Sequence, residues 1–214
     1  MATEPFDYLP RALRHLHKRE PCFRAMRRMV GPFTLRIHRD RFRLLAQSII
    51  SQQISTRAAE AISARLQASI KPGRLTPEAL LAMSDAQLRG IGLSPQKLRY
   101  LRHLSEMVST GEVNLRRIHA HDDEAVIEQL TRIKGIGRWT AEMFLIFGLG
   151  RPDVLPADDF GLKLALKLHD GRPDLPTPAE VRARAEAWRP YATVGTWYCW
   201  QWLGKVREQA KAKA

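Results

Sequence analysis

Apolar residues recur with helical spacing along most of the chain, and residues typical of helix N-caps separate one apolar stretch from the next. Phe42, Leu45 and Ile49 follow the cap residue Asp40 and fall on one face of a helix. Only residues 33–37 resemble a short strand. Further helix starts are predicted at Tyr8, Pro21, Thr56, Thr76, Ser84, Ser94, Asp122 and Thr177. The pattern predicts an all-α protein.

Residues 130–160 depart from this regular pattern and read LTRIKGIGRWTAEMFLIFGLGRPDVLPADDF. An apolar helix end passes through Gly135-Ile-Gly137 into a new helix that begins near Arg138. Glycine accepts positive φ and allows close backbone approach, so both glycines are expected to permit a tight hairpin. Free N–H groups at a helix N-terminus favour an anion, and a phosphate would fit there.

Two adjacent carboxylates, Asp158 and Asp159, follow this hairpin and precede another apolar segment. Either aspartate can begin the next helix, and periodicity does not separate them. Their position is notable because the chain is strongly basic overall.

The charge balance narrows the partners without naming one. Lys and Arg number 35 against 22 Asp and Glu, which gives a net charge of +13. That excess suits nucleic acid, although a membrane surface or a ribosome would account for it equally well. No apolar run approaches the roughly 20 residues that span a bilayer, and residues 1–10 lack a signal-peptide pattern. A cytoplasmic protein is expected, associated with the nucleoid if the source is bacterial.

Cysteine usage excludes a cluster cofactor. Cys22 and Cys199 are the only cysteines, too few for a four-cysteine iron–sulfur cluster. A zinc site would need several suitably spaced histidines in addition. We expect two buried thiols that act as small apolar groups, and no cofactor.

The IKGIGRWTA hairpin, Trp139 within it and the later PADDF segment together resemble the helix-hairpin-helix DNA glycosylase superfamily. The likeness runs from about Asp40 onward and is greatest to the alkylation-repair branch, the 3-methyladenine DNA glycosylase II type. It implies two helical lobes with a DNA-binding cleft between them. Residues 45–155 would form the central lobe with the hairpin (130–148), and residues 1–44 and 156–214 the discontinuous second lobe. Larger members carry an additional N-terminal β domain for which this chain is too short.

The resemblance also implies a reaction. Asp159, the second aspartate of the pair and the one before an aromatic residue, would be the catalytic carboxylate, with Asp158 as a cap. The enzyme would flip a damaged nucleotide out of double-stranded DNA and hydrolyse its N-glycosidic bond as a monomer. Alkylated purines, 3-methyladenine and 7-methylguanine, would be the substrates, and the enzyme would be monofunctional.

Roles for further residues follow from the same likeness. The base pocket would contain Trp139, Trp197, Phe160 and Met143, the last standing where a relative has tyrosine. DNA-backbone contacts would come from Lys134, Gly135, Gly137, Arg138 and Thr140. Leu93 or Pro95 would be the wedge, Gln52 and Gln53 would contact the backbone or the gap left by the flipped base, and the carbonyls of Ile133 and Ile136 would hold a structural cation.

Other interpretations remain open from the residues alone. Leu93 and the tryptophans suit an ordinary core, the glutamines suit an unpartnered helix end, and the N-terminal arginines suit a solvated face. A non-catalytic hairpin module would need the glycine turn and basic charge but not Asp159. A mismatch-specific adenine or thymine glycosylase is weakened by the missing cluster cysteines, and a lyase by Trp139, where such relatives carry lysine.

Overall fold

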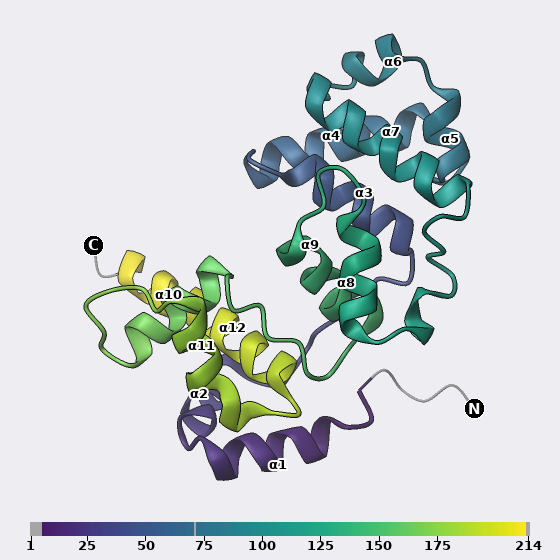
Figure 1. Ribbon diagram of the computed structural model, residues 1–214. Coiled ribbons are helices and arrows are strands. Elements are labelled where there is room, and N and C mark those ends of the chain that lie inside the picture. Colours follow the sequence, from purple (N-terminus) through teal and green to yellow (C-terminus); the bar gives the residue numbers. More distant parts are fainter. Residues whose placement is uncertain (1–5, 71, 213–214) are drawn as a thin grey trace. The chain divides into compact units, whose positions relative to one another are not determined.

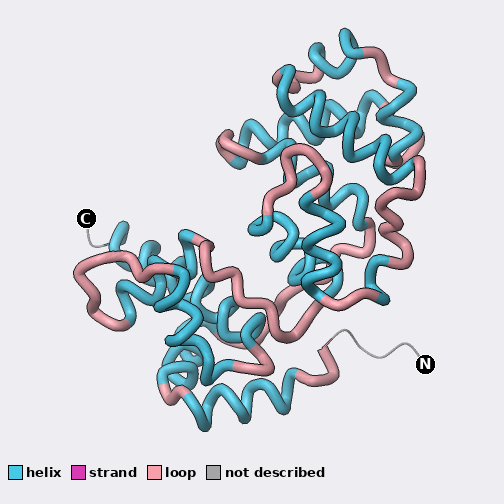
Figure 2. Tube along the Cα trace, viewed as in Figure 1, coloured by secondary structure: helices cyan, strands magenta, loops and turns pink. Residues whose placement is uncertain are grey.

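Helices account for all the regular secondary structure in the part of the chain that the computed structural model describes, residues 6–70 and 72–212 (Figures 1 and 2). The all-α prediction is therefore confirmed. The prediction of a short strand over residues 33–37 is wrong. Its alternating pattern reflects packing, because Phe33 lies against Trp197 with ring centroids 4.8 Å apart and Leu35 is buried.

The chain divides into two compact units, one of residues 38–148 and one of residues up to 37 and from 149 onward. Both boundaries lie earlier than the predicted 44/45 and 155/156. The reason is helix α3 (Arg41–Ser51), which packs on the helices of the hairpin unit from its first turn. A hydrogen bond from the His38 N–H to the Phe147 carbonyl, 2.8 Å long, joins the two chain segments where they enter and leave this unit.

The hairpin unit is built around α3 and α7. Leu45, Ile49, Leu101 and Leu104 on these helices are almost fully buried, and each contributes about 1.5–3 kcal/mol to folding. The predicted caps at Asp40, Ser94 and Asp122 each accept a backbone N–H three residues on. Its other helices are α4 (Thr56–Ser69), α5 (Pro77–Ala82), α6 (Asp85–Gly90), α7 (Pro95–Ser109), the 3-10 helix η1 (Ile118–Ala120), α8 (Asp123–Thr131) and α9 (Arg138–Phe144), which continues into the π-helical turn η2 (Leu145–Leu149).

The second unit is built around α12 (Ala192–Ala212), which packs against α2 and α10. Gly195 of α12 is required by this packing, since a Cβ there would lie 2.7 Å from the Trp188 ring. Cys199 is buried in the same helix, and burial raises the pKa of its thiol. The other helices of this unit are α1 (Leu9–Arg19), α2 (Cys22–Val30), α10 (Phe160–His169), α11 (Pro178–Ala185) and η3 (Glu186–Trp188).

Among the described residues, no helix combines the length and the apolar character needed to cross a bilayer.

Candidate functional site

The hairpin between α8 and α9 depends on one glycine more than on the other. Gly135 has φ +87°, and a Cβ at this position would lie 2.2 Å from the Tyr100 ring. Only glycine fits there without strain. Gly137 has φ −92° and no atom within 4 Å of a Cβ position, so the prediction that the turn itself needs both glycines is wrong.

Side chains from the end of α3 and from α7 hold the hairpin in place. The Gln52 Nε2 donates to the Gly135 carbonyl at 2.8 Å, across 83 positions of sequence. The Lys134 N–H donates to His103 Nδ1 at 3.1 Å, which places the proton of a neutral His103 ring on Nε2. Gln52, predicted to contact the DNA backbone or the gap left by a flipped base, has its amide directed to the hairpin. It positions the turn.

The outer edge of the hairpin offers backbone donors. The Ile136 N–H is used inside the turn, since it donates to the Ile133 carbonyl at 3.0 Å. Within the described residues, no acceptor is recorded for the N–H groups of Gly135, Gly137 or Arg138. These three N–H groups at the start of α9 suit an anion such as a phosphodiester.

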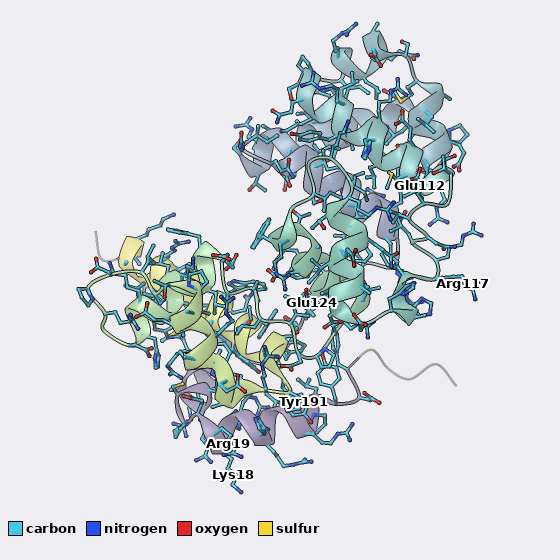
Figure 3. The ribbon with its side chains drawn as sticks, viewed as in Figure 1. Lys18, Arg19, Glu112, Arg117, Glu124 and Tyr191 are labelled. Atoms are coloured by element: carbon cyan, nitrogen blue, oxygen red, sulfur yellow. The ribbon has the colours of Figure 1, made fainter. Side chains whose placement is uncertain are left out.

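The Arg138 side chain is committed to carboxylates. Its guanidinium donates to both Glu124 oxygens, at 3.0 and 2.5 Å, and its Nε lies 3.2 Å from a Glu142 oxygen. These hydrogen bonds lower the pKa of Glu124 and raise that of Arg138. Figure 3 labels Glu124 at the start of α8. The Arg138 side chain therefore joins α8 to α9 and is not open to an anion in this arrangement.

Two other predicted DNA-backbone residues have different environments. Thr140 lies on the buried face of α9, so its side chain offers little surface to DNA, and its contact with the DNA backbone stays a prediction. Lys134 is exposed beside the turn, and its ammonium can reach solvent or a phosphate.

A predicted structural cation would bind the carbonyls of Ile133 and Ile136. The Ile133 carbonyl already accepts the Ile136 N–H, which leaves one lone pair for another ligand. The Gly135 carbonyl next to them is bound by Gln52. Such a cation would add rigidity to the turn, and it stays a prediction.

Asp159 is held in one orientation at the start of α10. Its N–H donates to the Pro156 carbonyl in a tight turn, and its Oδ1 caps the helix by accepting the Leu162 N–H at 2.6 Å. The same Oδ1 accepts the Trp200 Nε1–H at 2.7 Å. Asp159 as a whole is 8% exposed. Two donors on one oxygen restrict the orientation of the carboxylate.

Asp158 has a different position from its neighbour. It is exposed and pairs with Lys163 at 3.2 Å. The prediction that Asp158 is the cap is wrong, because Asp159 is the residue that caps α10. A helix cap and an oriented carboxylate are combined in one side chain.

The aromatic residues predicted for a base pocket divide into exposed and buried ones. Phe160 is 61% exposed beside Asp159, Trp139 is 48% exposed on α9, and Met143 is half-buried one turn later. Trp197 is only 5% exposed and packs against Phe33 and Tyr198, so little of its ring is open to a base.

Trp200 is the functional candidate that the sequence reasoning missed. It lies one turn after Trp197 and contacts Asp159 directly. Gly161 leaves room for this contact, since a Cβ there would lie 3.1 Å from Asp159 Oδ1 and 3.3 Å from the Trp200 ring. The TWYCWQW segment carried the signal, but three tryptophans in it gave no choice of register.

The candidates for the wedge and the gap differ in their exposure. Leu93 is 4% exposed and belongs to the core of the hairpin unit, so the prediction that it enters DNA is not supported by its position. Pro95 is exposed as the first residue of α7. Gln53 is exposed with φ 55°, a strained value for a residue other than glycine, and this places it at the tip of the α3–α4 loop.

The helical hairpin before α9 and the capping carboxylate of Asp159 are features that the sequence motifs led us to expect of a helical DNA-repair protein. The family model of the HhH-GPD superfamily base excision DNA repair proteins matches residues 46–190, and the chain belongs to this family.

Among relatives, DNA-3-methyladenine glycosylase 1 of Schizosaccharomyces pombe is 36% identical over 159 residues, covering 73% of this chain and 70% of that protein. The DNA-3-methyladenine glycosidase structure from Bacillus halodurans has a TM-score of 0.82 and 34% identity, and covers 92% of this chain and 91% of its own. The S. pombe 3-methyladenine DNA glycosylase in complex with abasic DNA has a TM-score of 0.78 and 32% identity, and covers 89% and 95%.

Proposed function

We propose that this protein is a monofunctional DNA glycosylase that hydrolyses the N-glycosidic bond of alkylated purines in double-stranded DNA. The observation that carries the proposal is Asp159, a carboxylate oriented by Trp200 and by the α10 N-terminus. Relatives at 36% and 34% identity are named for 3-methyladenine, which supports this substrate class. The enzyme acts as a monomer in base excision repair.

Asp159 acts on the charge that develops during bond cleavage. Positive charge appears on the sugar as the base leaves, and a carboxylate stabilises it. At about 4 Å and an effective dielectric near 20, this attraction is worth roughly 4 kcal/mol. That corresponds to about a thousandfold in rate. Water, oriented or assisted by Asp159, is the nucleophile.

The hairpin holds the duplex without reading its sequence. N–H groups of Gly135, Gly137 and Arg138 bind a backbone phosphate, and the exposed Lys134 adds charge beside them. Pro95 at the start of α7 and Gln53 in the α3–α4 loop, both exposed, lie at the gap left by the flipped base. Flipping costs a few kcal/mol, which such contacts help to offset.

Exposed aromatic faces select the base by charge. Alkylation at N3 or N7 makes a purine cationic, which weakens its glycosidic bond and favours stacking on electron-rich rings. A desolvated cation–π contact gives roughly 2 kcal/mol. Trp139 and Phe160 present the exposed rings for this role, and Trp200 supports Asp159.

We expect release of 3-methyladenine and 7-methylguanine to be clearly faster than release of hypoxanthine or 8-oxoguanine. The cationic bases gain the aromatic contact and leave more readily, whereas the neutral bases gain neither. Single-turnover rates on duplexes that differ only in the lesion measure this order. Equal or faster release of the neutral bases would remove the electrostatic basis of the selection.

No covalent enzyme–DNA adduct is expected when borohydride is added during the reaction. A Schiff base needs an amine nucleophile, and Trp139 occupies the place of the lysine found in lyase-type relatives. Lys134 is the lysine of the hairpin, and its backbone N–H is held by a hydrogen bond to His103. Gel analysis of the trapped reaction checks this, and an adduct that disappears in Lys134→Ala would show a lyase mechanism instead.

A further inference from the structure

Helices α1 and α2 carry a concentration of positive charge that the proposed reaction does not use. Residues 9–30 contain seven lysines and arginines and a single acidic residue, Glu20. Glu20 is paired with Arg184 at 2.7 Å. It is therefore already engaged and leaves most of this local charge uncompensated.

Part of that charge surrounds a pocket of about 460 Å³ where the last turn of α1 meets α2. Arg24, Arg27 and Arg28 stand at i, i+3 and i+4, so they share one face of α2. Within the described residues these three arginines form no ion pair. The lining contains cations and no carboxylate: His17, Arg24, Arg27, Arg28, Gly31 and Pro32.

His17 contributes a polar atom that lacks a partner. Its Nε2 is buried and has no hydrogen-bond partner among the described residues. Burial, Arg27 and Arg24 all lower the pKa of the His17 imidazole, so the ring lies close to both guanidinium groups. A buried, unpaired imidazole nitrogen among cations is costly unless something binds there.

Helix stabilisation accounts for only part of this cluster. Arg27 and Arg28 lie in the last turn of α2, where cations interact favourably with the helix dipole. Arg24 lies in the first turn, where a cation is unfavourable, and it repels the other two arginines. The arrangement is better suited to a ligand than to an empty surface.

The pocket is separate from the catalytic carboxylate. The Tyr198 hydroxyl donates to the Gly31 carbonyl at the pocket edge, at 3.5 Å, whereas Trp200 contacts Asp159. Tyr198 and Trp200 are two positions apart on α12, so their side chains point about 200° apart around the helix axis. The two contacts therefore lie on opposite sides of α12. DNA that contacts Asp159 therefore does not occupy the pocket through the same contact.

We propose that this pocket binds a phosphate group, held by the guanidinium groups of α2 and by His17 Nε2. Guanidinium groups donate paired, charge-assisted hydrogen bonds to phosphate oxygens, and the imidazole N–H adds one more. The phosphate belongs either to a small phosphorylated molecule or to the backbone of a second DNA segment. The recognition chemistry is the same in both.

The test compares two double variants of the full chain that remove equal charge. Arg24→Gln/Arg28→Gln changes the pocket, and Arg14→Gln/Lys18→Gln changes exposed residues of α1 outside its lining. Figure 3 shows Lys18 projecting away from α1. Pyrophosphate is titrated by calorimetry, and the His17 ring is followed by NMR.

Wild-type protein should bind pyrophosphate saturably, and the pKa of His17 should rise as the ligand offsets Arg24 and Arg27. The pocket variant should lose at least about tenfold in affinity, because two charge-assisted contacts disappear, while the α1 variant stays within about twofold. No saturable change at His17, or equal losses in the two variants, would overturn the proposal.

A second measurement identifies the source of the phosphate. Affinity for undamaged duplex DNA is measured as a function of salt. If DNA is the ligand, the pocket variant reduces the salt slope by about two relative to the α1 variant. If a small molecule is the ligand, the two slopes agree and only pyrophosphate binding is lost. Both results support the site, and they assign it to different ligands.

Discussion

Asp159→Asn is expected to reduce base release by at least about a hundredfold while leaving folding and DNA binding intact. Asparagine keeps an oxygen that can accept the Leu162 and Trp200 N–H groups, so the α10 cap survives. The substitution removes only the negative charge that stabilises the developing sugar cation. Single-turnover release from alkylated duplex DNA, together with binding measured separately, distinguishes the chemical step from affinity.

The matched control is Asp158→Asn, which removes the same charge one residue earlier. Asp158 is exposed and paired with Lys163, so near wild-type release is expected. Strongly reduced base release in Asp158→Asn, with normal base release in Asp159→Asn, would reverse the assignment of the catalytic carboxylate.

Gly135→Ala is expected to weaken binding to damaged and undamaged duplexes alike, by about tenfold to a hundredfold. A methyl group at φ +87° would meet the Tyr100 ring, and strain at such positions costs about 1–3 kcal/mol. The hairpin must shift, and its three N–H groups lose their alignment on phosphate. Fluorescence anisotropy with two duplexes that differ only in the lesion measures the effect.

Gly137→Ala separates the turn from the DNA contact. Its Cβ meets no protein atom, so the fold is retained and any loss of affinity reports close approach of DNA to this residue. We expect that loss to be similar for damaged and undamaged DNA. A loss confined to damaged DNA would place the hairpin in the lesion pocket.

The steric cause at Gly135 has its own test. Adding Tyr100→Ala to Gly135→Ala should restore part of the lost affinity for DNA, which would confirm that the methyl group meets the Tyr100 ring.

The sequence predicts the helical class, the caps, the hairpin and Asp159 because these depend on local spacing and local backbone chemistry. Asp40 and Thr177 act through backbone N–H groups three residues on, and Gly135 acts through its own positive φ, all of which a pattern can represent. The contact that Gly135 avoids with Tyr100 is not local. The link from Gln52 to Gly135 spans 83 positions and depends on how α3 and the hairpin pack. Such a contact has no local signature.

Helical register explains the remaining errors. Trp197 and Trp200 are one turn apart on α12, and the sequence does not tell which of them meets the core and which meets Asp159. The sequence likewise does not tell which face Thr140 and Leu93 occupy, since a single polar or apolar residue suits either face of a helix end. Packing decides these positions, and it places both in the interior.

The most direct test of the central claim is the release of free base from alkylated duplex DNA by the unmodified full chain. Chromatography of the soluble products should show 3-methyladenine, and the DNA should retain abasic sites in an unbroken backbone. Release no greater than that of Asp159→Asn, or backbone cleavage that accompanies each base released, would contradict a monofunctional glycosylase acting through Asp159.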